Sequence, residues 1–255
     1  AKERIVSLSP SITEIIYALG VGKDLVATST YSLYPKDAQK LPTVGSYTNP
    51  NIEKILSFHP TVVVGDFYNK KTLEKLKYFH TKTISLKLKT ITSIKKSITT
   101  LAKALNKDLI AKKLIQDIDD AIKSIKKSNR NKKVMIVYGL HEDLRDGIYI
   151  AGDDIFFNDI IKLCGDQNVY TDKTTSQPVL TYEGVIALNP DIIVILYSKE
   201  SEKGVNVQKA IDAWNKLPTT ASREHKIFVI DDDYIYIPSH RIALSIKRIA
   251  KEIQR

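Results

Sequence analysis

A repeat of twelve residues constrains the fold of this chain more than any other feature. Residues 53–64 and 183–194 each contain a glutamate, an apolar helical pattern, a proline and a β-branched run. Residues 13–20 and 158–165 form a second repeat, with a helix-capping residue, an acid in the first turn and a final glycine. The separation is too long for a solenoid, whose units recur every ~20–50 residues. The sequence therefore predicts two similar lobes, with a small-molecule site in the cleft between them.

Apolar β-branched segments alternate with amphipathic helical patterns in both halves. Strands are predicted at residues 5–8, 62–64, 134–138, 192–196 and 227–230, and helices at 12–19, 51–58 and 70–79. Residues 9–11 are predicted to form a turn. This alternation indicates parallel sheets flanked by helices, the α/β class.

Residues 91–125 repeat apolar positions at helical spacing without a proline or glycine. They form either one long helix or two helices broken near Asn106 and Asp108, the second of which connects the lobes. The predicted domains are an N-terminal lobe at 1–90, a helical segment containing the inter-lobe helix at 91–130, and a C-terminal lobe at 131–255.

Composition excludes several classes of protein. The longest β-branched runs are far shorter than the roughly 20 apolar residues of a membrane span. The net charge is +10, but the lysines are scattered, and the densest cluster, at 123–133, lacks the interleaved aromatic residues that stack on bases. We therefore expect no nucleic-acid partner.

The chain begins at Ala1 without an apolar signal core, as an exported protein does after signal removal; a trimmed cytosolic chain would begin in the same way. No cysteine stands at the start, so the sequence does not support a lipid anchor.

Catalytic motifs are absent from the sequence. It contains no GxSxG, GxxxxGK[ST], GxGxxG or HExxH. The single cysteine, Cys164, excludes a disulfide, a cysteine zinc site and a metal-cluster oxidoreductase, and is interpreted as a core residue. The acidic run 231–233 lacks the alternation of a calcium loop and is interpreted as a solvated turn. We therefore predict a binding protein that is not an enzyme and has no catalytic cofactor.

Aromatic residues mark the predicted strand ends. The chain has 13 tyrosines and one tryptophan, and amphipathic rings suit a cleft that holds a large, partly apolar ligand. Of the five histidines, only His141 and His240 fall in loops that can face this cleft. The predicted ligand contacts are Tyr31, Tyr34, Tyr47, Phe67, Tyr68, Tyr138, His141, Arg145, Tyr234, Tyr236 and His240, although about half of the tyrosines are expected to be ordinary core-edge residues.

Several segments together resemble a known family. They are residues 4–20, the Tyr31–Pro35 loop, Leu41–Gly45, the two Glu…Pro repeats and the helix start at Pro238–Arg241. They resemble the class III substrate-binding proteins of ABC importers for vitamin B12, haem and ferric siderophores, over nearly the whole chain. The resemblance implies two pseudo-symmetric α/β lobes bridged by one long rigid helix.

The resemblance also implies a periplasmic monomer that delivers a metal chelate to the permease and ATPase complex of the inner membrane. In the family, one glutamate on the outer tip of each lobe pairs with arginines of the permease. Glu53 and Glu183 match these two positions. Twofold-related acids can engage a symmetric permease dimer with the same geometry at each end.

Within the family, the pattern is most similar to the vitamin B12-binding proteins. Tyr31 matches an aromatic residue that packs on the corrin, and Tyr47 falls where they carry a tryptophan. Where they carry further tryptophans this chain has Asp66, Phe67 and Gln177. The family's Arg-Pro-Gly-Pro-Arg segment reads Ile237 to Arg241 here, which disfavours a highly anionic tris-catecholate siderophore.

A corrinoid is therefore the favoured ligand. Haem stays open because Tyr31, Tyr47, His141 and His240 include both types of axial ligand, and so do ferric-siderophore and nickel chelates. A metallophore sensor would have the same sequence features.

Overall fold

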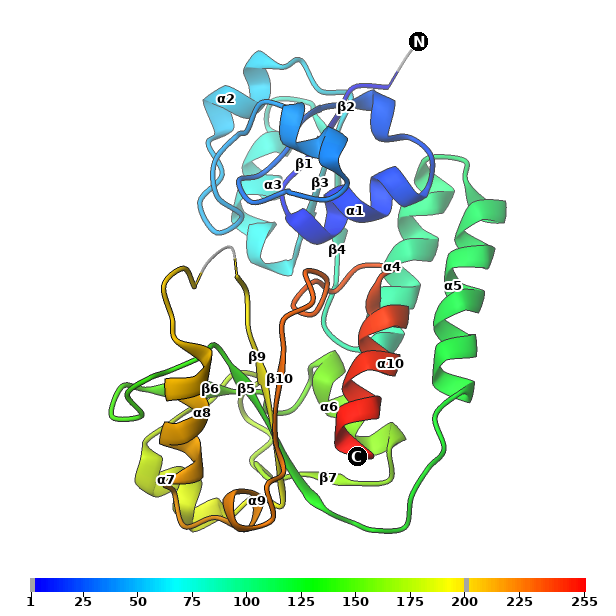
Figure 1. Ribbon diagram of the computed structural model, residues 1–255. Coiled ribbons are helices and arrows are strands. Elements are labelled where there is room, and N and C mark those ends of the chain that lie inside the picture. The colour runs from blue at the N-terminus through cyan, green and yellow to red at the C-terminus, as the bar shows by residue number, and fades with distance from the viewer. Residues whose placement is uncertain (1–2, 200–201) are drawn as a thin grey trace. The chain divides into compact units, whose positions relative to one another are not determined.

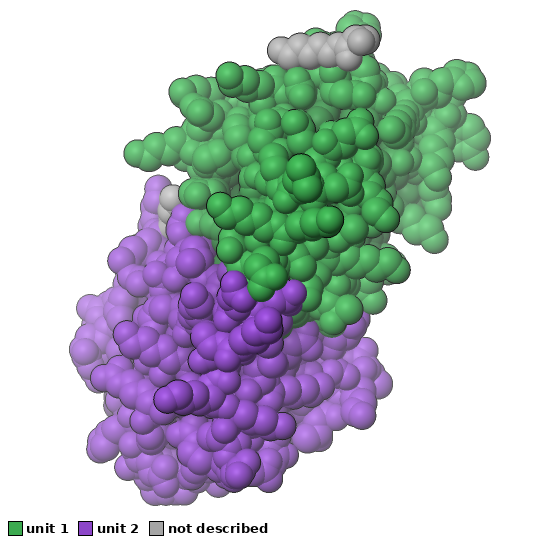
Figure 2. All heavy atoms as spheres, turned by 90° about the vertical axis from the view of Figure 1, so that its right-hand side faces the viewer, with its two compact units in different colours: residues 1–118, 237–241 green, residues 119–236, 242–255 purple. Residues whose placement is uncertain are grey.

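The chain divides into two compact units in the computed structural model, which describes residues 3–199 and 202–255 (Figures 1 and 2). Unit 1 comprises residues 1–118 and 237–241, and unit 2 comprises residues 119–236 and 242–255. Each unit has its own sheet with helices on both faces, which confirms the predicted α/β class.

The sheet of unit 1 is wholly parallel. Its order is β2 (Leu25–Ala27), β1 (Ile5–Ser7), β3 (Val62–Asp66) and β4 (Lys82–Leu86). Every residue of β3 is buried, because a central parallel strand is covered on both faces. Val6, Val63 and Leu76 lie in one apolar core beneath it.

Four helices flank this sheet. Helices α1 (Pro10–Ala18) and α4 (Ile91–Ala104) lie on one side, and α2 (Ile52–Ser57) and α3 (Lys70–Lys77) lie on the other (Figure 1). The predicted turn at residues 9–11 was wrong. Helix α1 begins at Pro10, because the Ser9 hydroxyl accepts the Ile12 N–H at 3.3 Å and proline is tolerated in the first turn.

The helical region after β4 consists of two helices, α4 and α5 (Asp108–Lys123). They are separated at Asn106, which has a left-handed φ of 55°, while the Lys107 N–H still reaches the Ala102 carbonyl at 2.8 Å. The second of the two alternatives is therefore confirmed. Helix α5 passes from unit 1 into unit 2 after Ile118.

The sheet of unit 2 is mixed. Its order is β10 (Ile227–Ile230), β9 (Ile192–Leu196), β5 (Lys133–Tyr138), β6 (Ile148–Ile150) and β8 (Val179–Leu180). The first three strands and the short β7 (Gln167–Asn168) are parallel, whereas β6 is antiparallel to both of its neighbours. After β5 the chain therefore turns back and pairs with β5 as the antiparallel strand β6. Unit 1 has no equivalent strand among its described residues.

Five helices lie around this sheet. Helices α6 (Phe156–Leu163) and α10 (Ile242–Ile253) lie on one side, and α7 (Tyr182–Leu188) and α8 (Val207–Asn215) lie on the other (Figure 1), with the short α9 (Thr220–Arg223) before β10. Trp214 and Met135 are fully buried in the core. Cys164 is also buried, as predicted, and burial raises the pKa of its thiol to about 12.

The twelve-residue repeat has one structure in both units. Each copy is a capped short helix, α2 or α7, followed by a fully buried five-residue strand, β3 or β9. The residue before each proline is left-handed, with φ of 46° at His59 and 48° at Asn189. In the second repeat, α1 and α6 are followed by Gly20 and Gly165 at φ of 78° and 81°, as predicted. The predicted caps were wrong, because α1 begins after Ser9 and α6 after Ile155, so Thr13 and Asn158 lie inside the helices and the first turn of α1 has no acid.

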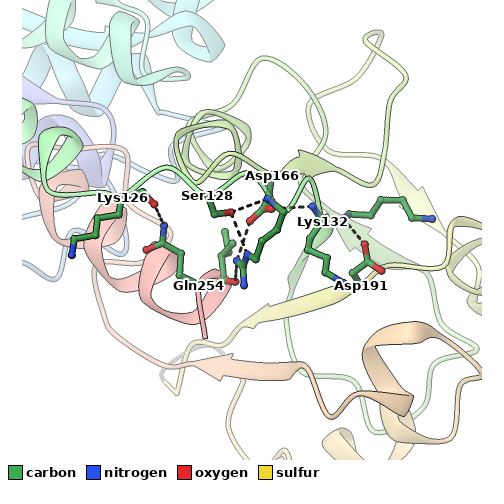
Figure 3. A network of polar contacts seen from close by, with 9 residues as sticks. Lys126, Ser128, Lys132, Asp166, Asp191 and Gln254 are labelled. Carbon is green, nitrogen blue, oxygen red and sulfur yellow. Dashed lines mark hydrogen bonds and ion pairs between the residues drawn. The ribbon is translucent and has the colours of Figure 1, made fainter.

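A polar network ties the segment after α5 to the rest of unit 2 (Figure 3). The Asp166 carboxylate accepts the Lys132 N–H at 2.9 Å and the Arg130 guanidinium at 3.3 Å. Arg130 also donates to the Ile253 carbonyl at 2.9 Å, and Gln254 donates to the Lys126 carbonyl at 2.6 Å. Part of the basic cluster at 123–133 therefore anchors helix α10. Within the described residues, no helix is both long and apolar enough to cross a bilayer.

Candidate functional site

Aromatic side chains gather in unit 1 just beyond the carboxyl end of β3. The Tyr68 ring meets the edges of Tyr47 and Phe67, with centroid separations of 5.6 and 5.9 Å. We call these three residues the unit 1 aromatic cluster. Tyr68 and Phe67 are 56% and 59% exposed, so apolar ring surface faces solvent at the strand end. Ligands of open parallel sheets bind beyond this edge.

Asp66 and Asn69 hold the cluster in place. Asp66 accepts the Tyr68 N–H at 2.8 Å, and Asn69 accepts the Asp66 N–H at 3.0 Å, which caps the 3-10 turn Phe67–Asn69. Asn69 also donates to the Tyr47 carbonyl at 2.6 Å, so two separate loops are joined. Burial raises the pKa of the Asp66 carboxyl.

The Tyr47 phenol is half-buried and strongly disfavours ionisation. Burial, followed by the nearby Tyr68 and Asp66, raises its pKa to about 12. Tyr47 is therefore a neutral phenol at pH 7, with an apolar face and a polar tip. It can act as a phenolate ligand only where a metal ion displaces its proton.

Tyr31 stands on the loop after β2 and is 78% exposed. Its φ of 63° lies in the left-handed region, which bulky residues rarely adopt. Beneath the loop, the hydroxyls of Thr13, Thr28 and Ser32 form a buried chain, with Thr28 2.6 Å from Thr13 and 2.8 Å from Ser32. This chain fixes the loop while the Tyr31 ring projects outward, an outlier of the kind found at binding sites.

Tyr34 lies against a buried ion pair in unit 1. The Arg241 guanidinium donates to both carboxylate oxygens of Glu14, at 2.6 and 2.9 Å, and its carbon stands 3.7 Å from the Tyr34 ring centroid. Ser239 adds a third bond to Glu14 at 2.6 Å. Because Glu14 balances the charge of Arg241, this arginine serves the fold of unit 1 and the orientation of Tyr34.

His240 precedes this arginine. Its Nδ1 is buried, and among the described residues it has no hydrogen-bond partner. Burial, reinforced by Arg241, lowers the pKa of His240 to about 4, so the side chain is neutral at physiological pH.

The lowered pKa of His240 makes the stability of the folded protein depend on pH. The unfolded chain takes up the His240 proton near pH 6.5, whereas the folded protein does so only near pH 4. The contribution of neutral His240 to the free energy of unfolding is complete above about pH 6.5 and is lost as the pH falls toward 4. Urea unfolding of His240→Asn should show a smaller loss of stability over this window. His80→Asn, a change at an exposed loop histidine, is the control; equal slopes in the two variants would contradict the assignment.

In unit 2, aromatic rings pack together at the end of β5 and in the loop after β10. Tyr138 stacks on Tyr236, with centroids 6.1 Å apart and planes at 28°, and meets Phe157 edge-on at 5.6 Å. The Tyr236 hydroxyl accepts the Gly139 N–H at 3.2 Å and donates to the Leu196 carbonyl. Burial raises the pKa of Tyr236. Tyr138, Tyr236 and Phe157 are the unit 2 aromatic cluster.

The structure does not bring the other predicted contacts of unit 2 into this cluster. Arg145 is exposed and pairs with Asp143, and its charge acts on Tyr182 beside Glu183. Tyr234 lies near Asp232, and its pKa is raised mainly by burial. His141 lies in the loop after β5, but its Nε2 is buried and has no hydrogen-bond partner within the described part of the chain.

Glu53 and Glu183 occupy equivalent places in the two units. Each lies in the first turn of its short helix and is exposed, after the caps Asn51 and Thr181. Hydrogen bonds from its own backbone, Tyr182 and Thr181 lower the pKa of Glu183. Both positions suit an anionic contact with a partner.

No metal centre is assembled by the side chains of residues 3–199 and 202–255, because no group of three or more His, Cys, Asp and Glu residues lies together.

Four residues that shape these surfaces were not predicted from the sequence: Glu14, Asn69, Phe157 and Glu202. Only Glu14 carried a usable signal, because an acid among Ile12, Ile15 and Ile16 must be buried and so requires a partner.

Each α/β unit carries an aromatic cluster near a strand end, which is largely exposed in unit 1 and half-buried or buried in unit 2. The sequence matches the model of the periplasmic binding protein family over residues 5–234. The chain therefore belongs to this family, and the resemblance inferred from the sequence is confirmed.

The similar proteins are named for different ligands. The chain is 29% identical to a vitamin B12-binding protein of Vibrio parahaemolyticus, over 99% of this chain and 90% of that protein. It is 28% identical to the ABC transporter substrate-binding lipoprotein YvrC of Bacillus subtilis, over 98% and 80%. Among solved structures, the periplasmic haem-binding protein HutB of Vibrio cholerae matches with a TM-score of 0.83 and 25% identity, over 100% of both chains. All three relatives are named as binding proteins, and one of them as part of an ABC transporter.

Proposed function

We propose that this protein is the substrate-binding component of an ABC importer and that it captures a metal chelate. A corrinoid is the favoured chelate. The protein would work outside the cytoplasmic membrane, deliver its ligand to a permease and ATPase complex, and catalyse no reaction itself.

The observation that carries this proposal is the exposed unit 1 aromatic cluster, together with Tyr31. Its rings combine wide apolar faces with phenol tips, which suit a large, flat ligand with a polar periphery. In unit 2, the half-buried rings of Tyr138 and Tyr236 offer a second, less exposed surface. The similarity to a vitamin B12-binding protein supports the corrinoid choice.

Haem is the second candidate, and the similarity to HutB favours it. Tyr47 is a neutral phenol without a ligand, so it could serve as an axial ligand of haem iron only if the iron displaced its proton. Absorption spectra distinguish the two ligands, because cobalamin absorbs differently from haem that is ligated by tyrosine or histidine. Protein purified from its native host should be coloured, and titration with cyanocobalamin should saturate at lower concentration than titration with haemin.

Replacing Tyr31 or Tyr47 with alanine should weaken binding of the preferred chelate. Each change removes apolar contact worth roughly 1–3 kcal/mol, which corresponds to about tenfold to a hundredfold in affinity. Isothermal titration measures the loss, and the melting temperature should change little for Tyr31, whose ring is exposed.

Tyr78→Ala is the matched control, because Tyr78 is 84% exposed in the same unit and lies after helix α3, outside the cluster. An unchanged affinity in the Tyr31→Ala, Tyr47→Ala double variant would place the ligand elsewhere.

A further inference from the structure

The carboxyl ends of three adjacent strands in unit 2 are joined by two side chains. Tyr236 joins the ends of β5 and β9 through Gly139 and Leu196. Glu202 joins the two loops that follow, since one carboxylate oxygen accepts the Leu140 N–H at 2.7 Å and the other accepts the Ser198 N–H at 2.7 Å. One carboxylate therefore fixes both loops relative to each other.

Further contacts keep Glu202 in this position. Its own N–H donates to the Ser198 carbonyl at 2.9 Å, and its carbonyl accepts the Tyr197 hydroxyl at 3.4 Å. Both the backbone and the carboxylate of Glu202 are thus held by hydrogen bonds. The two bonds to the carboxylate are charge-assisted, and such bonds are among the stronger hydrogen bonds in proteins.

Gly139 makes this arrangement possible. Its φ is 87°, and a β-carbon at this position would lie 2.9 Å from Oε1 of Glu202 and 3.5 Å from Nε2 of His141. A side chain would therefore displace the carboxylate and strain the backbone together. The glycine between Tyr138 and Leu140 is required where the carboxylate approaches the strand end.

We propose that Glu202 is a positioning residue that holds the β5 and β9 loops so that Tyr138 and His141 are fixed for the ligand. This inference rests on the proposed function, in which the unit 2 aromatic cluster contacts the chelate. Fixing these loops in advance lowers the ordering cost that binding would otherwise carry. Glu202 itself contacts the backbone and is not assigned a ligand contact.

The test compares Glu202→Ala, Glu202→Gln and Gly139→Ala with wild type. The probes are cyanocobalamin and haemin, and amide hydrogen exchange of Leu140 and Ser198 is measured without ligand. We expect Glu202→Ala to weaken binding of the preferred probe by about tenfold and to speed exchange of both amides by at least about tenfold. Glu202→Gln should show smaller changes in the same direction and guards against misfolding of the alanine variant. Gly139→Ala should reproduce the effect by displacing the carboxylate.

Glu142→Gln is the matched control, because exposed Glu142 in the same loop accepts a single backbone N–H, that of Asn206, at 2.7 Å. It should change affinity by less than about twofold. Faster exchange with unchanged probe affinity would overturn the inference, since Glu202 would then stabilise the loops only. Unchanged exchange would also overturn it. If wild type binds neither probe, the proposed chelate is wrong, whereas unchanged exchange in Glu202→Ala overturns the role of Glu202 whatever the ligand is.

Discussion

Charge reversal of Glu53 and Glu183 to lysine in one protein is expected to abolish uptake of the chelate while leaving its capture intact. Both side chains are exposed in the first turn of a short helix, α2 or α7. If they pair with arginines of a permease, each reversal replaces an attraction with a repulsion, which costs several kcal/mol at an interface. Two such changes are sufficient to prevent productive docking.

The measurements are growth on the limiting chelate, ligand affinity and thermal unfolding. Neither glutamate belongs to an aromatic cluster, so affinity should stay within about twofold of wild type. The control is a protein with Glu74→Lys and Glu224→Lys, which carries the same charge change on one exposed acid in each unit. Normal growth with Glu53 and Glu183 reversed would show that they only stabilise their helices.

The same experiment separates capture from docking. A protein that binds the chelate normally but supports no uptake would place both glutamates at the permease contact. Loss of binding as well would indicate that the helices carrying them shape the ligand site, and the transport assignment would then need other evidence.

The architecture could be predicted because it depends on local patterns. The repeated Glu…Pro segment specifies a helix, a left-handed residue and a buried strand in both units, as His59 and Asn189 show. The start of α1 was misplaced because proline was interpreted as a turn, although Ser9 caps a helix that tolerates proline in its first turn. The antiparallel β6 was not predicted either, since three residues carry too little pattern to set a strand direction.

The candidate site was predicted only in part, for a physical reason. Tyrosines at strand ends were identified because a strand end can be located from sequence, and Tyr47, Tyr68, Tyr138 and Tyr236 do form ring clusters. Which loops touch one another depends on contacts distant in sequence. Arg145 pairs with its neighbour Asp143. Glu202 bridges two loops, and the Leu140 N–H that it accepts lies 62 residues earlier in the sequence. No local pattern encodes such a bridge.

Arg241→Met is expected to cause a large loss of stability in unit 1. The change leaves the Glu14 carboxylate buried without its guanidinium, and removing one partner of a buried ion pair costs about 3–5 kcal/mol. Urea unfolding followed by circular dichroism measures this loss. The cation above the Tyr34 ring also disappears, so Tyr34 should become more mobile.

The double variant Glu14→Leu, Arg241→Met separates the cost of an unpaired charge from the loss of packing. With both charges removed, much of the stability should return, because apolar residues of similar size often replace a buried ion pair at little cost. Ser239 would lose its acceptor on Glu14, so recovery should be incomplete by about 1 kcal/mol. If the single variant unfolds at the same urea concentration as wild type, Glu14 must be solvated or protonated after the change, and the ion pair would not be what holds residues 237–241 in unit 1.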